Sequence, residues 1–218
     1  MPTDLPGLIA RRLAEPLPGL HAQARMAPTS ERRVITPEGE DCREAATLLL
    51  FYPDGGDASG FDAWRFVLTL RPPTLRNHSG QVALPGGSVD PGESIEEAAL
   101  REGEEEIGVD RDVPHVLGSL TRLFIPPSGF CVTTVVATLD AKPDMIASPD
   151  EVAAIIEPTL GDLLDVEKRK QKKIDASSGI RLDAPYFDIG GHVVWGATAM
   201  MLAEFVDVLE EMQEAVER

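Results

Sequence analysis

Apolar side chains recur with two different periods along the chain, and each period predicts a different kind of element. The apolar, β-rich runs 45–52 and 65–70 flank the turn-rich segment 53–60, which predicts two strands joined by a hairpin loop. Segments 95–107 and 197–216 instead carry apolar residues three and four positions apart, which is typical of amphipathic helices. Further short apolar runs, separated by loops that contain proline or glycine, predict strands at 81–84, 115–120, 131–139, 152–156, 185–189 and 192–195.

This order of elements predicts the class of fold. Strands, a central helix, more strands and a final helix favour an α/β fold of the mixed α+β kind, an α/β/α sandwich with a mixed β-sheet. Regular alternation of strand and helix is absent, which disfavours a doubly wound dinucleotide-binding fold. Segment 160–173 is expected to form a short helix or loop with a basic tail. Residues 1–40, with an amphipathic piece at 5–14, are expected to form an N-terminal arm that packs on a domain of residues 41–218.

Composition and charge narrow the classes of partner. At 218 residues with 43% hydrophobic content, the chain can bury one core. Its net charge of −17 argues against a nucleic acid or an anionic membrane as partner, because both require a basic surface. The chain has no apolar run long enough to cross a bilayer and no secretory signal pattern, so we expect a cytoplasmic protein. Cys42 and Cys131 lack metal-type spacing and are expected to be reduced thiols, with Cys131 in the core.

A strongly acidic segment follows a pair of glycines in the middle of the chain. Ser94 and Glu97 are spaced as a capping box, and Gly108 is a suitable C-terminal residue, so we expect a helix over residues 95–107. The stripe of this helix that can pack on the sheet consists of Ile95, Ala99, Gly103 and Ile107.

Three carboxylates of the expected helix, Glu102, Glu105 and Glu106, are neighbours, because residues three and four apart lie side by side on a helix surface. Like charges so placed repel one another unless a cation lies among them, and Mg²⁺ prefers oxygen ligands together with substrate phosphates. The preceding Gly86 and Gly87 would let the backbone approach a bound phosphate closely. The alternative is a solvated acidic face with no ligand, which is the usual role of a charge run.

The spacing of these residues resembles the Nudix box, the signature of the Nudix hydrolases. The positions that match it in order and spacing are Gly87, Glu93, Arg101-Glu102, Glu105-Glu106, Gly108 and Val109. The resemblance implies a Nudix-type sandwich. It also implies that Glu102, Glu105 and Glu106 are the catalytic residues, which hold Mg²⁺ or Mn²⁺ and of which one can act as base toward the attacking water.

Other residues of the box are implied to be structural. By the same resemblance Glu93 and Arg101 form the pair that holds the loop against the helix, with a plain surface ion pair as the alternative. Nudix enzymes often recruit a further acid from outside the box, and Glu151 is the candidate in this chain. Gly103 departs from the family's pattern, which has an aliphatic residue at that position. No ligand is lost by this departure.

A second motif precedes the box and resembles the coenzyme A pyrophosphatase branch of the family. The positions that match are Val67-Leu68-Thr69, Arg71, Arg76, Gly80 and Leu84-Pro85-Gly86-Gly87. Pro72 and Leu84 depart from the branch, which favours serine and phenylalanine there. Guanidinium groups bind phosphate through paired hydrogen bonds, so Arg71 and Arg76 are expected to bind substrate together with the glycine pair. An arginine lying along the sheet edge is the alternative.

The leading hypothesis is therefore a metal-dependent pyrophosphohydrolase. It would cleave the diphosphate of coenzyme A or its thioesters to 3′,5′-ADP and (acyl-)4′-phosphopantetheine. Another nucleoside diphosphate derivative, such as ADP-ribose or NADH, is an alternative substrate within the same fold. A non-catalytic nucleotide-binding module is an alternative from a different class of function. The last helix, with Met200, Met201, Phe205 and Met212, could supply the face of a homodimer.

Overall fold

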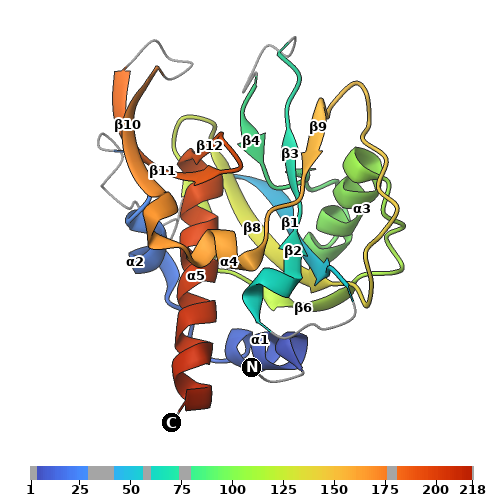
Figure 1. The fold of residues 1–218 in the computed structure, drawn as a ribbon. Helices are drawn as coiled ribbons and strands as arrows, with labels where there is room; N and C mark the ends of the chain where they lie inside the picture. Colours follow the sequence, from blue (N-terminus) through green and yellow to red (C-terminus); the bar gives the residue numbers. More distant parts are fainter. Residues whose placement is uncertain (1–3, 29–41, 56–59, 74–79, 176–180, 218) are drawn as a thin grey trace.

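The computed structural model describes residues 4–28, 42–55, 60–73, 80–175 and 181–217 (Figure 1). Its central sheet has six strands and is mixed. The strands are β1 (Arg43–Pro53), β2 (Trp64–Phe66), β5 (Gly86–Ser88), β6 (His115–Ser119), β7 (Leu123–Ile125) and β8 (Phe130–Thr138). Strands β1 and β8 run parallel, paired from Arg43 and Phe130 to Phe51 and Thr138. Strands β2 and β5 pair antiparallel with β1, and β6 and β7 pair antiparallel with β8.

Two smaller antiparallel sheets extend the molecule on one side of the central sheet. The first has the order β4-β3-β9, with β3 (Leu68–Leu70), β4 (Val82–Ala83) and β9 (Ala154–Ile156). The second has the order β10-β11-β12, with β10 (Arg169–Asp175), β11 (Arg181–Ile189) and β12 (His192–Trp195). Two short helical segments, α4 (Leu160–Leu164) and η3 (Val166–Lys168), connect β9 to β10, whereas η2 (Phe61–Ala63) lies between β1 and β2.

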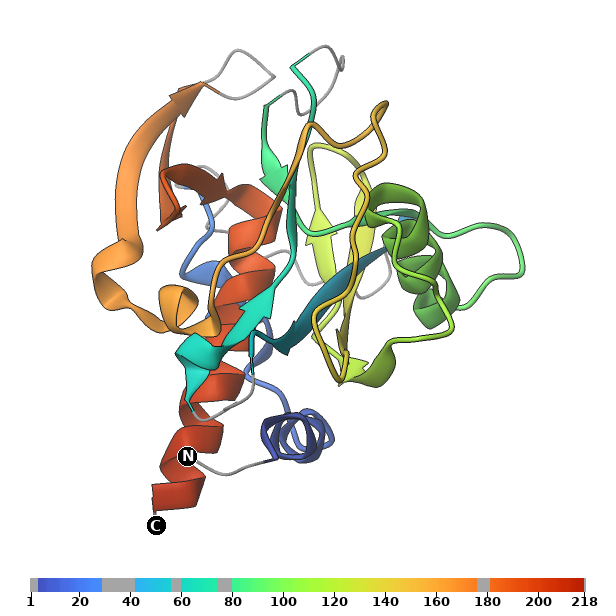
Figure 2. The same ribbon diagram turned by 45° about the vertical axis from the view of Figure 1, so that its right-hand side comes forward.

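The two long helices cover opposite faces of the central sheet, as Figures 1 and 2 show for α3 (Ile95–Ile107) and α5 (Gly196–Glu217). Strand β1 lies between them and is buried on both faces. Leu49 and Phe51 belong to the core on the α5 side, whereas Leu48, Leu50 and Tyr52 belong to the core on the α3 side. A strand buried on both faces reads as a continuous apolar run rather than an alternating one. The predicted α/β/α sandwich with a mixed sheet is confirmed.

Two predicted elements differ from the structure. The run 65–70 was expected to be one strand, but it divides at Val67 into β2 and β3, which belong to different sheets. The backbone N–H of Val67 still donates to the carbonyl of Leu50 at 3.0 Å. The basic tail expected at the end of 160–173 is strand β10, because it pairs with β11 along seven residues. Periodicity within one strand does not reveal which strand it will pair with.

Residues near the N-terminus form α1 (Leu5–Leu13) and α2 (Gly19–Ala24), and both contact α5. The contact of α2 centres on Glu204, a fully buried carboxylate of α5. It accepts hydrogen bonds from the Gly19 N–H (3.1 Å), the Gln23 side-chain amide (2.7 Å) and the Thr121 N–H (3.2 Å). An arm on residues 1–40 stays a prediction, because 29–41 lie outside the described residues.

The last helix does not offer the dimer face that its methionines suggested. Met200, Met201, Phe205 and Met212 are each at most 9% exposed, because they fill the core between α5 and the sheet. A further observation concerns membranes: no helix in the described part of the chain is both long and apolar enough to cross one.

Cys42 and Cys131 are not reduced thiols, as the sequence had suggested, but form a disulfide. The parallel pairing of β1 with β8 places Glu44 opposite Cys131, so that Cys42, just before β1, comes within a Cα–Cα distance of 5.8 Å. The two residues are 89 positions apart, and only the sheet register brings them together. Cys131 is fully buried, as expected.

Replacing Glu204 by alanine should lower the free energy of unfolding by about 3 kcal/mol, because one buried and two partly buried N–H donors lose their acceptor. The matched control is Glu211→Ala, which removes a half-exposed carboxylate of the same helix that pairs with Arg12 and should cost less than about 1 kcal/mol. Urea denaturation of both variants measures the difference. Equal losses would contradict the role of Glu204.

Reducing the disulfide should lower the free energy of unfolding by about 2–4 kcal/mol, because the reduced unfolded chain gains the freedom that the closed loop had restricted. Denaturation with and without a phosphine reductant measures this. The Cys42→Ser/Cys131→Ser variant is the control, and its stability should not respond to reductant. If the stability of the wild-type protein also did not change with reductant, the disulfide would be contradicted.

Candidate active site

The carboxylates of α3 lie at its C-terminal half, where the helix turns one side toward the sheet. The capping box of Ser94 and Glu97 starts the helix, and Gly108 ends it with a left-handed backbone (φ 73°), so the predicted bounds 95–107 are confirmed. Glu102 and Glu106 are one turn apart, and Glu106 lies on the buried side with 3% of its surface exposed. Glu105 projects outward, with 52% of its side chain exposed.

Glu106 is a carboxylate held inside the protein without a hydrogen-bonded cation in the described structure. Its Oε2 accepts a hydrogen bond from the Thr69 hydroxyl at 3.4 Å, and the Gly86 N–H also donates to it. Burial raises the pKa of Glu106 to about 7. The Gly86 hydrogen bond and the nearby charge of Arg71 oppose this shift, while the charges of Glu102 and Glu151 add to it.

Arg101 connects the loop before α3 to the carboxylates on it. Its guanidinium donates to both oxygens of Glu93 (2.9 and 3.1 Å) and to the Ser88 carbonyl (3.0 Å). It also donates to Glu102 at 2.8 Å and to Glu105 at 3.1 Å. Its hydrogen bond lowers the pKa of Glu93. The structure thus brings Glu93 and Arg101 together as the resemblance implied. The same guanidinium also donates to two of the three box carboxylates, Glu102 and Glu105.

Glu102 is pressed against the glycine pair. A Cβ on Gly87 would come within 2.4 Å of Oε1 of Glu102, and one on Gly86 within 2.4 Å of the Ala46 carbonyl oxygen on β1. The sequence had suggested that these glycines admit a phosphate, whereas the close approaches in the structure are to protein atoms. Burial raises the pKa of Glu102 despite the Arg101 hydrogen bond, and the charges of Glu105 and Glu151 raise it further.

Glu151, the acid proposed from outside the box, is held close to α3 by the backbone. The Ser148 N–H donates to the Glu106 carbonyl at 2.9 Å, and the Glu151 N–H donates to the Ser148 carbonyl at 3.2 Å. This turn places the Glu151 carboxylate near enough to raise the pKa of both Glu102 and Glu106. The sequence named Glu151 only from its family resemblance, since nothing local marks it.

Of the arginines expected to bind substrate, Arg71 is described and Arg76 is not. Arg71 follows β3 and has a buried Nε with no hydrogen-bond partner among the described residues. Its charge is close enough to lower the pKa of Glu106. A buried donor without an acceptor is costly, which favours a ligand at this position. Arg76 and the neighbouring His78 lie in 74–79, outside the described residues.

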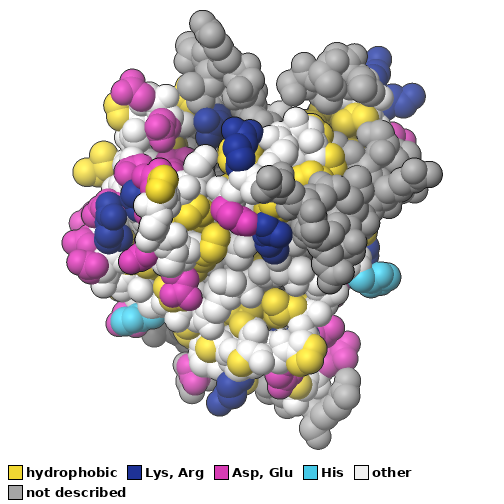
Figure 3. Space-filling model, turned by 180° about the vertical axis from the view of Figure 1, so that it is seen from behind, with side chains coloured by type: hydrophobic (Ala, Val, Ile, Leu, Met, Phe, Trp, Pro, Cys, Tyr) yellow, Lys and Arg dark blue, Asp and Glu magenta, His cyan; other side chains and the backbone are white. Residues whose placement is uncertain are grey.

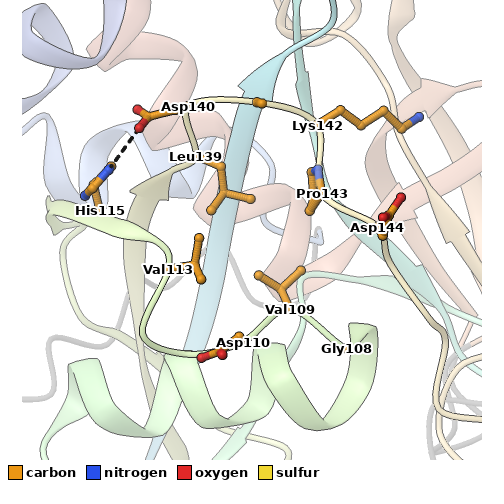
Figure 4. A pocket seen from close by; sticks show the side chains of 11 residues that line it. Gly108, Val109, Asp110, Val113, His115, Leu139, Asp140, Lys142, Pro143 and Asp144 are labelled. Carbon is orange, nitrogen blue, oxygen red and sulfur yellow. Dashed lines mark ion pairs between the residues drawn. The ribbon is translucent and has the colours of Figure 1, made fainter.

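A well-formed pocket of the structure lies away from these carboxylates. A pocket of about 520 Å³ lies beyond the C-terminal end of α3, lined by residues 108–110 and 139–144 together with Val113 and His115 (Figure 4). Its lining is mainly apolar at the centre, and His115 lies 3.6 Å from Asp140 at its rim. Seen from behind, acidic side chains also gather along the edge where α3 lies (Figure 3). Glu104 of α3 pairs with Arg111.

The donor atoms near α3 suit a divalent cation in kind. All are carboxylate oxygens, which hard ions such as Mg²⁺ and Mn²⁺ prefer, and their mutual repulsion raises the pKa of Glu102 and Glu106. They are not already gathered around one point: within the described ranges, no three acidic, histidine or cysteine side chains are placed to share an ion. Arg101 accounts for part of this, because it holds Glu102 and Glu105 to itself.

Comparison with known families agrees with this site. The model of the Nudix domain matches residues 43–177, which include the whole box and the turn of Glu151. The chain belongs to the Nudix family. It is 36% identical over 146 residues to the uncharacterized Nudix hydrolase NudL of Photorhabdus laumondii, a match that covers 66% of this chain and 76% of that protein. NudL of Yersinia pestis is also 36% identical, over 139 residues, with 62% of this chain and 68% of that protein covered.

Solved structures of Nudix proteins share the fold. The Nudix hydrolase RenU of M. smegmatis matches with a TM-score of 0.51 at 20% identity, over 78% of this chain and 87% of that one. A MutT/nudix family protein of Enterococcus faecalis matches with a TM-score of 0.52 at 20% identity, over 87% of this chain and 73% of that one. The family and its hydrolase relatives together identify this chain as a Nudix pyrophosphohydrolase.

The structure also explains Gly103, where Nudix boxes carry an aliphatic residue. A Cβ at this position would lie 2.6 Å from Cδ2 of Leu48, a buried residue of β1. The large Leu48 thus occupies the space that a larger residue on the helix would need. The sequence alone could not predict that Leu48 packs against Gly103, because the two residues are 55 positions apart and meet only across the helix–sheet interface.

Gly103→Val should lower the free energy of unfolding by about 1–3 kcal/mol, because it overpacks the contact with Leu48. Leu48→Ala alone should also destabilise, since it leaves a cavity. The double variant should be more stable than the sum of the two losses predicts, by at least about 1 kcal/mol. Urea denaturation of all four proteins gives this coupling, and additive losses would contradict the explanation.

Proposed function

We propose that this Nudix hydrolase cleaves the diphosphate of coenzyme A or its thioesters, with Mg²⁺ or Mn²⁺, to 3′,5′-ADP and (acyl-)4′-phosphopantetheine. The observation that carries the proposal is the pairing of the two motifs: the charge of Arg71 in the upstream motif is near enough to lower the pKa of Glu106 in the box, and the buried Nε of Arg71 has no described partner. A guanidinium next to a carboxylate cluster can bind the phosphates that a metal at the carboxylates also contacts.

Glu102, Glu105 and Glu106 would hold the metal, with Glu151 as a further acid. The ion, when bound, neutralises phosphate oxygens and lowers the pKa of a coordinated water. Arg101 takes one oxygen each from Glu102 and Glu105, and this leaves the second oxygen of both carboxylates without a hydrogen bond from it. The guanidinium can therefore orient the two side chains while they remain available to a cation.

The remaining residues have roles that follow from their contacts. The Thr69 hydroxyl and the Gly86 N–H fix the Glu106 carboxylate, so that its oxygens stay in one place. Glu106 is buried, which excludes bulk water and strengthens its interaction with a cation. One of the three box glutamates would accept the proton of the attacking water. Arg71, and Arg76 from the same motif, would bind the phosphates, and Gly86 and Gly87 would line their path.

There are two alternatives to this proposal, one in the substrate and one in the class of function. Pro72 and Leu84 depart from the coenzyme A branch, so ADP-ribose or NADH could be the nucleoside diphosphate derivative that this enzyme cleaves. A non-catalytic module that binds a nucleotide would retain the fold but not need the complete set of box glutamates, all of which are present.

A cytoplasmic location is part of the proposal, and Cys42 and Cys131 bear on it. Thiols are kept reduced in the cytosol, whereas these two residues form a disulfide in the structure. The oxidation state of both side chains in protein trapped with a thiol-blocking reagent at lysis tests the location. A homodimer would have to use a surface other than Met200, Met201, Phe205 and Met212, which are buried within the monomer.

Glu106→Gln should lower kcat for coenzyme A by about 100-fold or more, because it removes a negative ligand and a candidate base from the site. Glu104→Gln is the matched control: it makes the same change two residues away, where Glu104 pairs with Arg111, and should keep kcat within about twofold. The measurement is release of 3′,5′-ADP by liquid chromatography with Mg²⁺, with Mn²⁺ and with a chelator. ADP-ribose and NADH are tested in parallel.

Each outcome assigns the function differently. Metal-dependent 3′,5′-ADP release that needs Glu106 supports the proposal. Cleavage of ADP-ribose or NADH in place of coenzyme A keeps the chemistry of the box and overturns the substrate. Binding of nucleotides without turnover of any of the three would favour the non-catalytic module.

A further inference from the structure

Strand β10 concentrates positive charge in a protein that has 37 acidic and only 20 basic residues. Two of its cations are neutralised within the structure: Arg169 pairs with Glu210 at 2.8 Å, and Lys170 pairs with Asp188 at 2.6 Å. Lys172 and Lys173 differ from them. Neither forms a hydrogen bond or ion pair with another residue of the described ranges. The two lysines follow one another on the strand, so their side chains leave opposite faces of the sheet, and the Lys172 ammonium lies over the Tyr186 ring, 5.7 Å from its centroid.

Both lysines line a cleft of about 430 Å³ between two of the sheets. One wall is formed by residues 80–82, which include the start of β4, and the other by residues 172–174 of β10 and by 191–195, which include β12. Strands β4 and β12 lie side by side in Figures 1 and 2. The described residues that line the cleft include no carboxylate. Its size is within the range of small-molecule sites.

The chemistry of the walls suits a phosphorylated nucleoside. Lys172 supplies an ammonium group from the face of the sheet that also carries Trp195, Lys173 adds a second positive charge at the cleft, and His192 supplies an imidazole. Trp195, which lines the cleft with part of its surface, offers an aromatic face on which a base or ribose can pack. Asp183 is the acid in register opposite Lys173, and it does not line the cleft. The local charge is therefore positive.

Arg71 connects this cleft to the carboxylates of α3. Its N–H donates to the Gln81 carbonyl at 3.0 Å, and the Gly80 N–H donates to its carbonyl at 3.2 Å, so the wall of the cleft is hydrogen-bonded directly to Arg71. The positive charge of Arg71 in turn lowers the pKa of Glu106. Strand β4 is the terminal strand of its sheet and lies next to β12. Only a substrate with a second anionic group away from its diphosphate would use both places.

We propose that this cleft binds the 3′-phosphate of coenzyme A, with Lys172 as its cationic ligand, Lys173 adding positive charge at the same cleft, and Trp195 beside the attached nucleoside. The substrate identity rests on the proposed function. The cleft would then select for the phosphate that coenzyme A carries and dephospho-coenzyme A lacks. Ammonium groups recognise phosphate as point charges, so the preference should weaken as the ionic strength rises.

The test compares Lys172→Ala/Lys173→Ala with the control Lys170→Ala, which removes a lysine of the same strand that Asp188 already neutralises. The double variant should raise KM for coenzyme A about tenfold, because it loses charge-assisted contacts to one phosphate, and should leave KM for dephospho-coenzyme A and kcat for both nearly unchanged. The control should leave all four constants nearly unchanged. A rise in KM for both substrates alike would overturn the proposal.

Equilibrium binding separates this proposal from the proposed function, because it needs no turnover. By calorimetry, the wild-type protein should bind 3′,5′-ADP more tightly than 5′-AMP, and the double variant should lose that preference while the control keeps it. If coenzyme A is not cleaved but this preference is found, the cleft stands and the proposed function fails. If coenzyme A is cleaved but the wild-type protein shows no preference, the function stands and the cleft assignment is overturned.

Discussion

Burial of β1 on both faces is the constraint on which the rest of the structure depends. A strand in parallel pairing with β8 needs a long connection between the two, and both faces of the pair must be covered. The connection includes α3, which covers one face, and α5 covers the other. The same pairing brings Cys42 to Cys131 and brings β5 against β1 so closely that Gly86 has no room for a side chain.

This arrangement has an electrostatic consequence on the α3 side of the sheet. The helix must turn part of its surface inward, and its sequence puts Glu106 there rather than an apolar residue. A buried carboxylate without a bonded cation disfavours its own charged form, which is why its pKa is raised. Stability alone would favour a hydrophobic residue at this position. The retention of an acid beside Glu102 and Glu151 is understandable if the position serves a cation.

Arg101 lets these acids coexist in the folded protein. It gathers Glu93, Glu102 and Glu105 around one guanidinium and ties them to the Ser88 carbonyl, so the loop, the helix and the candidate ligands are oriented together. The positive charge of Arg71 lowers the pKa of Glu106. The backbone of Arg71 is hydrogen-bonded to Gly80 and Gln81, which line the cleft of Lys172 and Lys173. Under the proposed function, an anionic substrate would lie between these positive charges.

The sequence by itself determined what depends on neighbouring residues: the bounds and caps of α3, the apolar runs that became strands, the layered fold class and the box spacing that marks the family. These follow from local periodicity and capping, which a linear pattern records. Only the tertiary structure decided the disulfide, the division of 65–70 into two strands and the pairing that makes β10 a strand. It also decided the packing of Leu48 into the space beside Gly103 and the nearness of Glu151 and Arg71 to Glu106. Each of these depends on which distant segments pair in the sheets, and a pairing register is set by the packing of whole faces rather than by any one segment.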